Sequence, residues 1–339
     1  MVMDYWEKDL YRSIEVGGLK LNHRLVRVPG FQGKHPGCEK DSMEEPGSLV
    51  ITGGILPQWY DGDDGYDNDD GDINDVRTYY GYSKKQMKMW EKSCRQIHAS
   101  GSYVFVQLFD TDRLSEQEFL EIHNGKGHVD NFANSLTKEE IQLYVKAYVR
   151  AAKTSLMIGA DGVELHGASG YLLEEFLDPK INRRADEYGG SITNRAKFIL
   201  EVVDAIVKVV GAPRIGICLS PSDEHISLVT QYSYLLGQLE KRAVWGQRLA
   251  YIHLKESFVD LEEDQIGHFG GSHSFVYSIW RGIVIRGHSE LTDELRKCDR
   301  TLVAHVKRPG GERYWKGRSK FDSKTPLEYS KRTQCASTT

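Results

Sequence analysis

The chain has 339 residues, of which 40% are hydrophobic and 27% are charged, and its formal net charge is −5. This is the composition of an ordinary globular protein with a large core, and it gives no reason to expect a nucleic-acid partner. No apolar run is long enough to span a bilayer, and the charged N-terminus lacks the apolar core of a signal peptide. Five scattered cysteines without a CxxC pair favour free thiols. We therefore expect a cytoplasmic protein without a membrane partner.

Eight short apolar runs, rich in Val, Ile and Leu, follow one another along the chain. They are Leu25–Val28, Ser48–Thr52, Tyr103–Leu108, Gly162–Leu165, Ile215–Leu219, Ala250–Leu254, Ile283–Ile285 and Thr301–Val303. None of them alternates strictly between apolar and polar residues, which is typical of strands that are buried on both faces.

Segments with helical spacing of apolar residues lie between these runs. They are Lys84–Ala99, Thr137–Leu156, Thr193–Val210 and Val229–Trp245. The second begins with a capping box, in which Thr137 and Glu140 bind each other's backbone N–H groups. Strands that alternate with helices indicate a parallel sheet, and eight such units favour a closed barrel over an open sheet. The predicted fold class is α/β, as a (β/α)₈ TIM barrel.

Three regions depart from this alternation of strands and helices. Residues 61–75 form a dense acidic, Gly-rich segment that does not match the EF-hand pattern, so we expect a solvated loop. The linker between the first two runs has only a weak helix signal, which predicts a missing or stunted first helix. The end of the chain is polar and basic. We therefore expect residues 1–306 to form the barrel and residues 307–339 to form an irregular or partly disordered tail.

The most distinctive stretch begins where the fourth run ends, at the carboxyl end of a predicted strand, where active-site residues of such barrels lie. Residues 166–198 read HGASGYLLEEFLDPKINRRADEYGGSITNRAKF. His166 ends the strand, and Tyr171 follows five residues later. We interpret the DEYGGS turn as structural, because its glycines allow positive φ. Arg195 is expected to pair with a nearby carboxylate.

This stretch resembles the Old Yellow Enzyme family of FMN-dependent ene-reductases, especially its fungal branch. The resemblance continues in VTQYSYLLGQLEKRA at residues 229–243 and in GGSHSFVYSIWRGIVIR at residues 270–286. Segments LNHRLVRVPG, SLVITGG, SYVFVQLF and SLTKEEIQLYVKAYVRAAK carry it through the N-terminal half. It implies a (β/α)₈ barrel that binds FMN at the carboxyl ends of its strands.

The resemblance also implies roles for individual residues. His166 binds the substrate carbonyl, Tyr171 donates a proton, and Ser169 replaces an asparagine that shares the carbonyl with the histidine. Gly54 lies beside the flavin, and Gln107 binds its pyrimidine ring. The other candidates for cofactor binding are Pro29, Cys218, Gly287 and Lys307. The other candidates for the substrate pocket are Phe109, in place of a tryptophan, and Tyr329.

Some positions differ from the family pattern. Cys218 stands where the family has an arginine that contacts the flavin ring, and by itself a cysteine at a strand end reads as a small buried hydrophobe. The segment AHVKRPGGERYW replaces a Gly-Arg phosphate motif, although Lys307 supplies a charge there. Because each lost charge-assisted hydrogen bond weakens binding, we expect FMN to be weakly bound.

The predicted function is an FMN-dependent oxidoreductase, in which NADPH reduces the flavin and an α,β-unsaturated carbonyl compound reoxidises it. The alternative is a flavin-poor, catalytically weakened barrel that binds phenols, steroids or a protein partner. A metal-dependent barrel hydrolase is disfavoured, because the sequence shows no His/Asp/Glu ligand cluster at the strand ends, and no metal is expected. We expect a monomer or homodimer that takes an enone or a phenolic ligand.

Overall fold

The computed structural model describes residues 10–29, 46–53, 84–109, 133, 136–221, 226–255, 273–287 and 299–305. All helices, strands and contacts named below lie within these residues. Several sequence predictions lie outside them: the stunted first helix, the acidic loop at residues 61–75, the tail at residues 307–339, and the site candidates Gly54, Lys307 and Tyr329.

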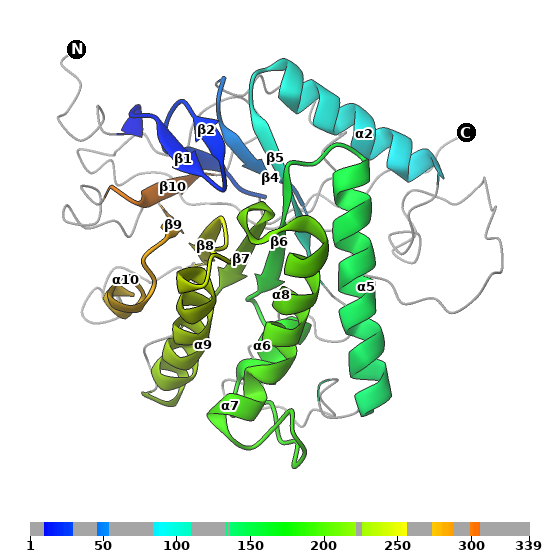
Figure 1. Cartoon of the computed structure of the whole chain (residues 1–339), viewed down its shortest axis with the longest axis vertical. Coiled ribbons are helices and arrows are strands. Elements are labelled where there is room, and N and C mark those ends of the chain that lie inside the picture. Colours follow the sequence, from blue (N-terminus) through cyan, green and yellow to red (C-terminus); the bar gives the residue numbers. More distant parts are fainter. Residues whose placement is uncertain are drawn as a thin grey trace, which may run out of the picture.

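Eight parallel strands close into a barrel (Figure 1). In the order in which they pair, they are β3 (Leu25–Arg27), β4 (Leu49–Ile51), β5 (Tyr103–Leu108), β6 (Gly162–Gly167), β7 (Ile215–Leu219), β8 (Tyr251–Leu254), β9 (Ile283–Gly287) and β10 (Thr301–His305). The last strand pairs with the first, which closes the barrel. Each of the eight predicted runs overlaps one of these strands, so the predicted barrel is confirmed.

Successive residues of each strand turn alternately toward the helices and toward the barrel interior. On β6, Val163 and Leu165 belong to the core shared with the helices, so Glu164 and His166 point into the barrel. A separate apolar cluster fills the interior toward the amino ends of the strands. It includes Val26, Leu49, Ile51, Phe105, Tyr251, Ile285 and Leu302. The polar interior residues therefore lie toward the carboxyl ends.

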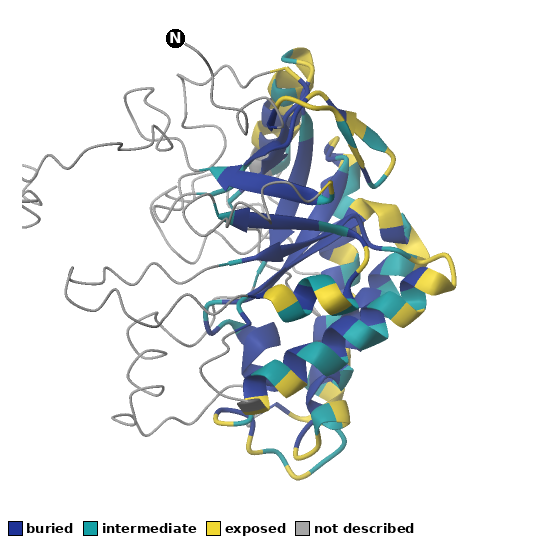
Figure 2. Ribbon diagram, turned by 90° about the vertical axis from the view of Figure 1, so that its left-hand side faces the viewer, coloured by how far each residue is buried: buried dark blue, intermediate teal, exposed yellow. Residues whose placement is uncertain are grey.

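Helices cover the outside of the barrel, and their exposed residues lie on the side away from the strands (Figure 2). The longer ones are α2 (Lys84–Ala99), α5 (Lys138–Met157), α8 (Lys197–Val210) and α9 (Ile226–Val244); the shorter ones are α6 (Leu172–Leu177), α7 (Ile192–Arg195), η3 (Ala212–Arg214) and α10 (Ser274–Ile279). None of the helices in the described ranges is both long and apolar enough to cross a membrane.

The helices α5, α7 and α8 differ in how closely they follow the sequence prediction. The capping box is confirmed: Thr137 Oγ1 accepts a hydrogen bond from the Glu140 N–H at 3.2 Å, and Glu140 Oε2 accepts one from the Thr137 N–H at 2.7 Å. The segment predicted as one helix over residues 193–210 is instead divided at Ala196 into α7 and α8.

A short hairpin that the sequence analysis missed lies beneath the barrel. It consists of β1 (Ile14–Val16) and β2 (Leu19–Leu21), and its inward residues Val16 and Leu21 are fully buried against the interior cluster. The turn residues Gly17 and Gly18 have φ values of 57° and 83°. Positive φ at both positions is what a two-residue hairpin turn requires, and glycine adopts it without steric cost.

This turn gives a prediction about stability. We expect Gly17→Ala to lower the free energy of unfolding more than Gly18→Ala does. A Cβ atom at Gly17 would lie 2.0 Å from the Pro213 carbonyl oxygen, whereas a Cβ atom at Gly18 would meet nothing within 4 Å. Both variants carry the strain of positive φ, about 1 kcal/mol, and the overlap adds about 1–3 kcal/mol at Gly17 alone. Urea unfolding measures both, and equal losses would contradict the contact.

Candidate active site at the carboxyl end of the barrel

His166 lies inside the barrel at the end of β6. It is 5% exposed, and neither ring nitrogen has a hydrogen-bond partner among the described residues. Burial, and then the charges of Lys255 and His253, lower the pKa of His166 to about 3. The imidazole is therefore neutral at physiological pH, with one nitrogen able to donate and the other able to accept. Because buried polar atoms are nearly always satisfied, these two nitrogens point to a polar ligand.

Two other predicted pocket residues surround His166. The ring centroid of Tyr171 lies 5.1 Å from that of His166, and the ring centroid of Phe109 lies 6.3 Å from it. Phe109 and Tyr171 also contact each other edge to face, at 5.5 Å. Tyr171 is the N-cap residue of α6, so the turn after β6 carries it back over the barrel mouth. The three rings therefore pack together at the carboxyl end of β6.

Ser169 occupies the turn between His166 and Tyr171. Its φ of 62° is the only positive value for a non-glycine residue in the described part of the chain. Its hydroxyl oxygen accepts a hydrogen bond from Nζ of Lys255, which directly follows β8. The sequence analysis missed Lys255; the available signal was its position immediately after a buried strand. Since the serine oxygen accepts from the lysine, its own proton remains available for donation.

The buried carboxylate of Glu174 fixes the conformation of this turn. Glu174 Oε2 accepts a hydrogen bond from the Gly170 N–H at 2.7 Å, and Glu174 Oε1 accepts one from Tyr232 at 2.7 Å and another from Ser220. Burial raises the pKa of Glu174, and these hydrogen bonds oppose the increase. The carboxyl group thus ties the β6 turn to the end of β7 and to α9.

The DEYGGS turn is structural, as expected, but the predicted partner of Arg195 is wrong. The Arg195 side chain donates to Oε1 of Gln231 at 2.9 Å and to the carbonyl oxygen of Gly190, rather than to a carboxylate. Glycine is required at the two positions for different reasons. Gly190 has a φ of 78°, and a Cβ atom at Gly189 would lie 2.3 Å from a backbone oxygen. The arginine therefore joins this turn to α9.

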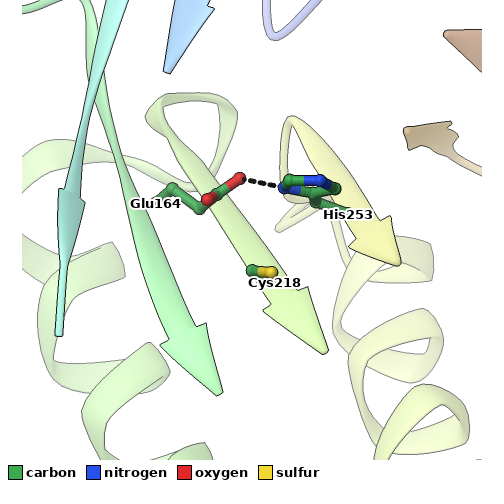
Figure 3. A group of neighbouring side chains, drawn as sticks. All are labelled: Glu164, Cys218 and His253. Carbon is green, nitrogen blue, oxygen red and sulfur yellow. Dashed lines mark hydrogen bonds and ion pairs between the residues drawn. The ribbon is translucent and has the colours of Figure 1, made fainter. Parts of the chain in front are cut away.

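Beside His166 in the barrel interior, three polar side chains from neighbouring strands converge (Figure 3). Glu164 on β6, Cys218 on β7 and His253 on β8 place their possible ligand atoms within 4.8 Å of one another. His253 Nδ1 lies 3.0 Å from Glu164 Oε2, and Gln107 Nε2 donates to Glu164 Oε1 at 2.7 Å. The expectation that no ligand cluster lies near the strand ends is therefore wrong. Residues that the sequence showed separately are brought together by the barrel.

The protonation of this cluster follows from its burial. Burial raises the pKa of the Cys218 thiol, although His253 opposes the shift. Burial by itself lowers the pKa of His253, but the acidic groups of Cys218 and Glu164 reverse this effect and raise it well above its usual value. Cys218 is buried as predicted, but its neighbours are polar.

Comparisons with known proteins identify this arrangement. A model of the NADH:flavin oxidoreductase / NADH oxidase family matches residues 9–305. The chain belongs to this family. Enoate reductase 1 of Kluyveromyces lactis is 37% identical in an alignment of length 321 that covers 83% of this chain and 78% of the relative. A probable NADPH dehydrogenase of Candida albicans is 33% identical in an alignment of length 341 that covers 87% of this chain and 80% of that protein.

A solved structure extends the similarity to the fold. The Old Yellow Enzyme from Pichia sp. AKU4542 superposes with a TM-score of 0.68 at 28% sequence identity, covering 89% of this chain and 84% of that one. The chain is thus a flavin oxidoreductase of Old Yellow Enzyme type, and the resemblance noted in the sequence is confirmed.

The family implies a flavin, and the described residues of this Old Yellow Enzyme homologue fit one. Pro29 lies two residues beyond β3 and Gly287 ends β9, so both half-buried residues lie at the carboxyl edge. Gln107 contributes an amide to the polar interior, and His166 keeps two unsatisfied ring nitrogens nearby. Residue 218 itself is a cysteine and supplies no cation; Lys255 follows β8 at this end of the barrel.

Proposed function

We propose that this protein is an NADPH dehydrogenase that uses FMN to reduce the carbon–carbon double bond of α,β-unsaturated carbonyl compounds. The observation that carries the proposal is His166, a neutral, buried imidazole with two unsatisfied nitrogens beside Tyr171 and Ser169. The names of the relatives, an enoate reductase and a probable NADPH dehydrogenase, support the same substrate class and reductant.

In this proposal the protein's own residues polarise the substrate. His166 and Ser169 donate hydrogen bonds to the carbonyl oxygen, which withdraws electrons from the conjugated double bond. Lys255, which holds the serine hydroxyl, adds positive charge on the same side of the pocket. A bound flavin supplies the hydride to the β-carbon. Tyr171 then protonates the α-carbon as the general acid.

We also propose which residues hold the ligands. Gln107 and Gly54 would contact the flavin ring, with Pro29, Cys218 and Gly287 around it, and Lys307 would face the phosphate. Phe109 and Tyr329 would line the substrate pocket. Because Cys218 brings no charge to the ring, FMN is expected to bind weakly, and Lys307 would replace only part of the phosphate contact, as a point charge.

Anaerobic spectroscopy tests the proposed function. Protein saturated with FMN is titrated with NADPH, and the oxidised flavin absorption should disappear; an added enone should then restore it. Reduction without reoxidation by any enone would reject the substrate class. If saturating FMN does not bind at all, the flavin-poor ligand-binding barrel becomes the better description.

Phenolate ligands test the substrate-binding residues. A phenolate held by His166 over oxidised flavin should give a long-wavelength charge-transfer band. We expect Ser169→Asn to tighten phenolate binding several-fold, since asparagine reaches further and one good hydrogen bond contributes about 1 kcal/mol. Asparagine also tolerates the positive φ at this position. Ser169→Gly is the matched control, because it tolerates the same φ without a donor and should weaken binding. Equal affinities in all three proteins would contradict the pose.

A further inference from the structure

We propose that Glu164, Cys218 and His253 form a three-ligand site for a divalent transition metal, with Zn²⁺ as the best match. A carboxylate oxygen, a sulfur and a ring nitrogen lie within 4.8 Å of one another. The three residues are 0%, 1% and 7% exposed. They stand on the successive strands β6, β7 and β8 and converge in the interior of the barrel (Figure 3). The site goes beyond the proposed reductase activity, which does not require a metal.

The donor set and its spacing suit zinc. Thiolate, imidazole and carboxylate together form a mixed set that zinc accepts, at bond lengths of about 2.0–2.3 Å. In a tetrahedron with these bonds, neighbouring ligand atoms are about 3.3–3.6 Å apart. Glu164 Oε2 and His253 Nδ1 are already 3.0 Å apart, and the third atom is within 4.8 Å. Small side-chain rotations therefore close the site, and water can take the fourth position.

An outer layer of contacts already orients the ligands. Gln107 donates to Oε1 of Glu164 at 2.7 Å, which leaves Oε2 directed toward His253. Such second contacts of a ligating carboxylate fix its orientation in known metal sites. Cys218 is in register with His166 at the barrel mouth, so an ion would enter from the carboxyl end.

Calorimetric titration of the full-length protein with zinc chloride alone tests the site. We expect one ion per chain and an affinity more than about 100-fold lower in Cys218→Ser. Cys94→Ser is the matched control, because Cys94 is equally buried but lies on α2 outside the cluster. It should bind zinc like the unchanged protein.

X-ray absorption at the zinc edge provides the second measurement, with one sulfur ligand expected at about 2.3 Å. If Cys218→Ser does not fold, Glu164→Gln and His253→Gln take its place, and each should also weaken binding. Unchanged affinity in these variants would place the ion at other residues and overturn the proposal. Loss of binding in Cys94→Ser would do the same, as would no binding by the unchanged protein at submillimolar zinc.

Discussion

Tyr171→Phe is expected to slow enone turnover by about 10²–10⁴-fold, the usual contribution of a positioned general acid, while flavin reduction by NADPH stays nearly unchanged. The two half-reactions differ because only the second delivers a proton to carbon. Tyr171 packs against His166 at 5.1 Å between ring centroids, so a donor on its ring stands beside the proposed carbonyl site. Phenylalanine keeps the ring contacts with His166 and Phe109 and removes only the hydroxyl.

Stopped-flow measurement of the two half-reactions separates these effects. Tyr188→Phe is the matched control, because its hydroxyl bonds Glu201 and Gln142 rather than lying at the barrel mouth. We expect that variant to change stability but neither rate. Similar losses of both rates in Tyr171→Phe would show that the tyrosine acts in binding or packing, and another group would then have to supply the proton.

Cys218→Arg is expected to tighten FMN binding by about 10- to 100-fold, since one charge-assisted hydrogen bond contributes about 1.5–3 kcal/mol. The structure gives the new guanidinium a buried partner, because the Glu164 carboxylate lies within 4.8 Å of the cysteine sulfur. A guanidinium that shares this carboxylate with His253 would bring a positive charge to the flavin ring.

Flavin titration measures this gain, and a chelator in all samples removes any contribution of metal to the cluster. Cys218→Ser is the control, since it changes the residue without adding charge, and its FMN affinity should match that of the unchanged protein. If Cys218→Ser raises the FMN affinity as much as Cys218→Arg does, the added charge is not the cause. Nanomolar FMN affinity in the unchanged protein would show that the missing contacts matter less than we propose.

The local pattern of the sequence determined the barrel and its helices. Apolar runs such as Ile215–Leu219 predict strands because a strand buried on both faces needs apolar side chains in succession, and this requirement is met within the run itself. The capping box at Thr137 is equally local, since both partners lie in one turn. The hairpin with Gly17 was not predicted, because strands of three residues are too short to show an alternation of apolar and polar residues.

Only the tertiary structure decided the contacts between strands. Glu164, Cys218 and His253 lie on three strands, and the lateral pairing and register of β6, β7 and β8 bring their side chains to one point. The hydrogen bond from Lys255 to Ser169 and that from Arg195 to Gln231 have the same origin. Burial patterns along a chain show which residues turn inward. They do not show which inward residues meet, because closure of the barrel sets those distances.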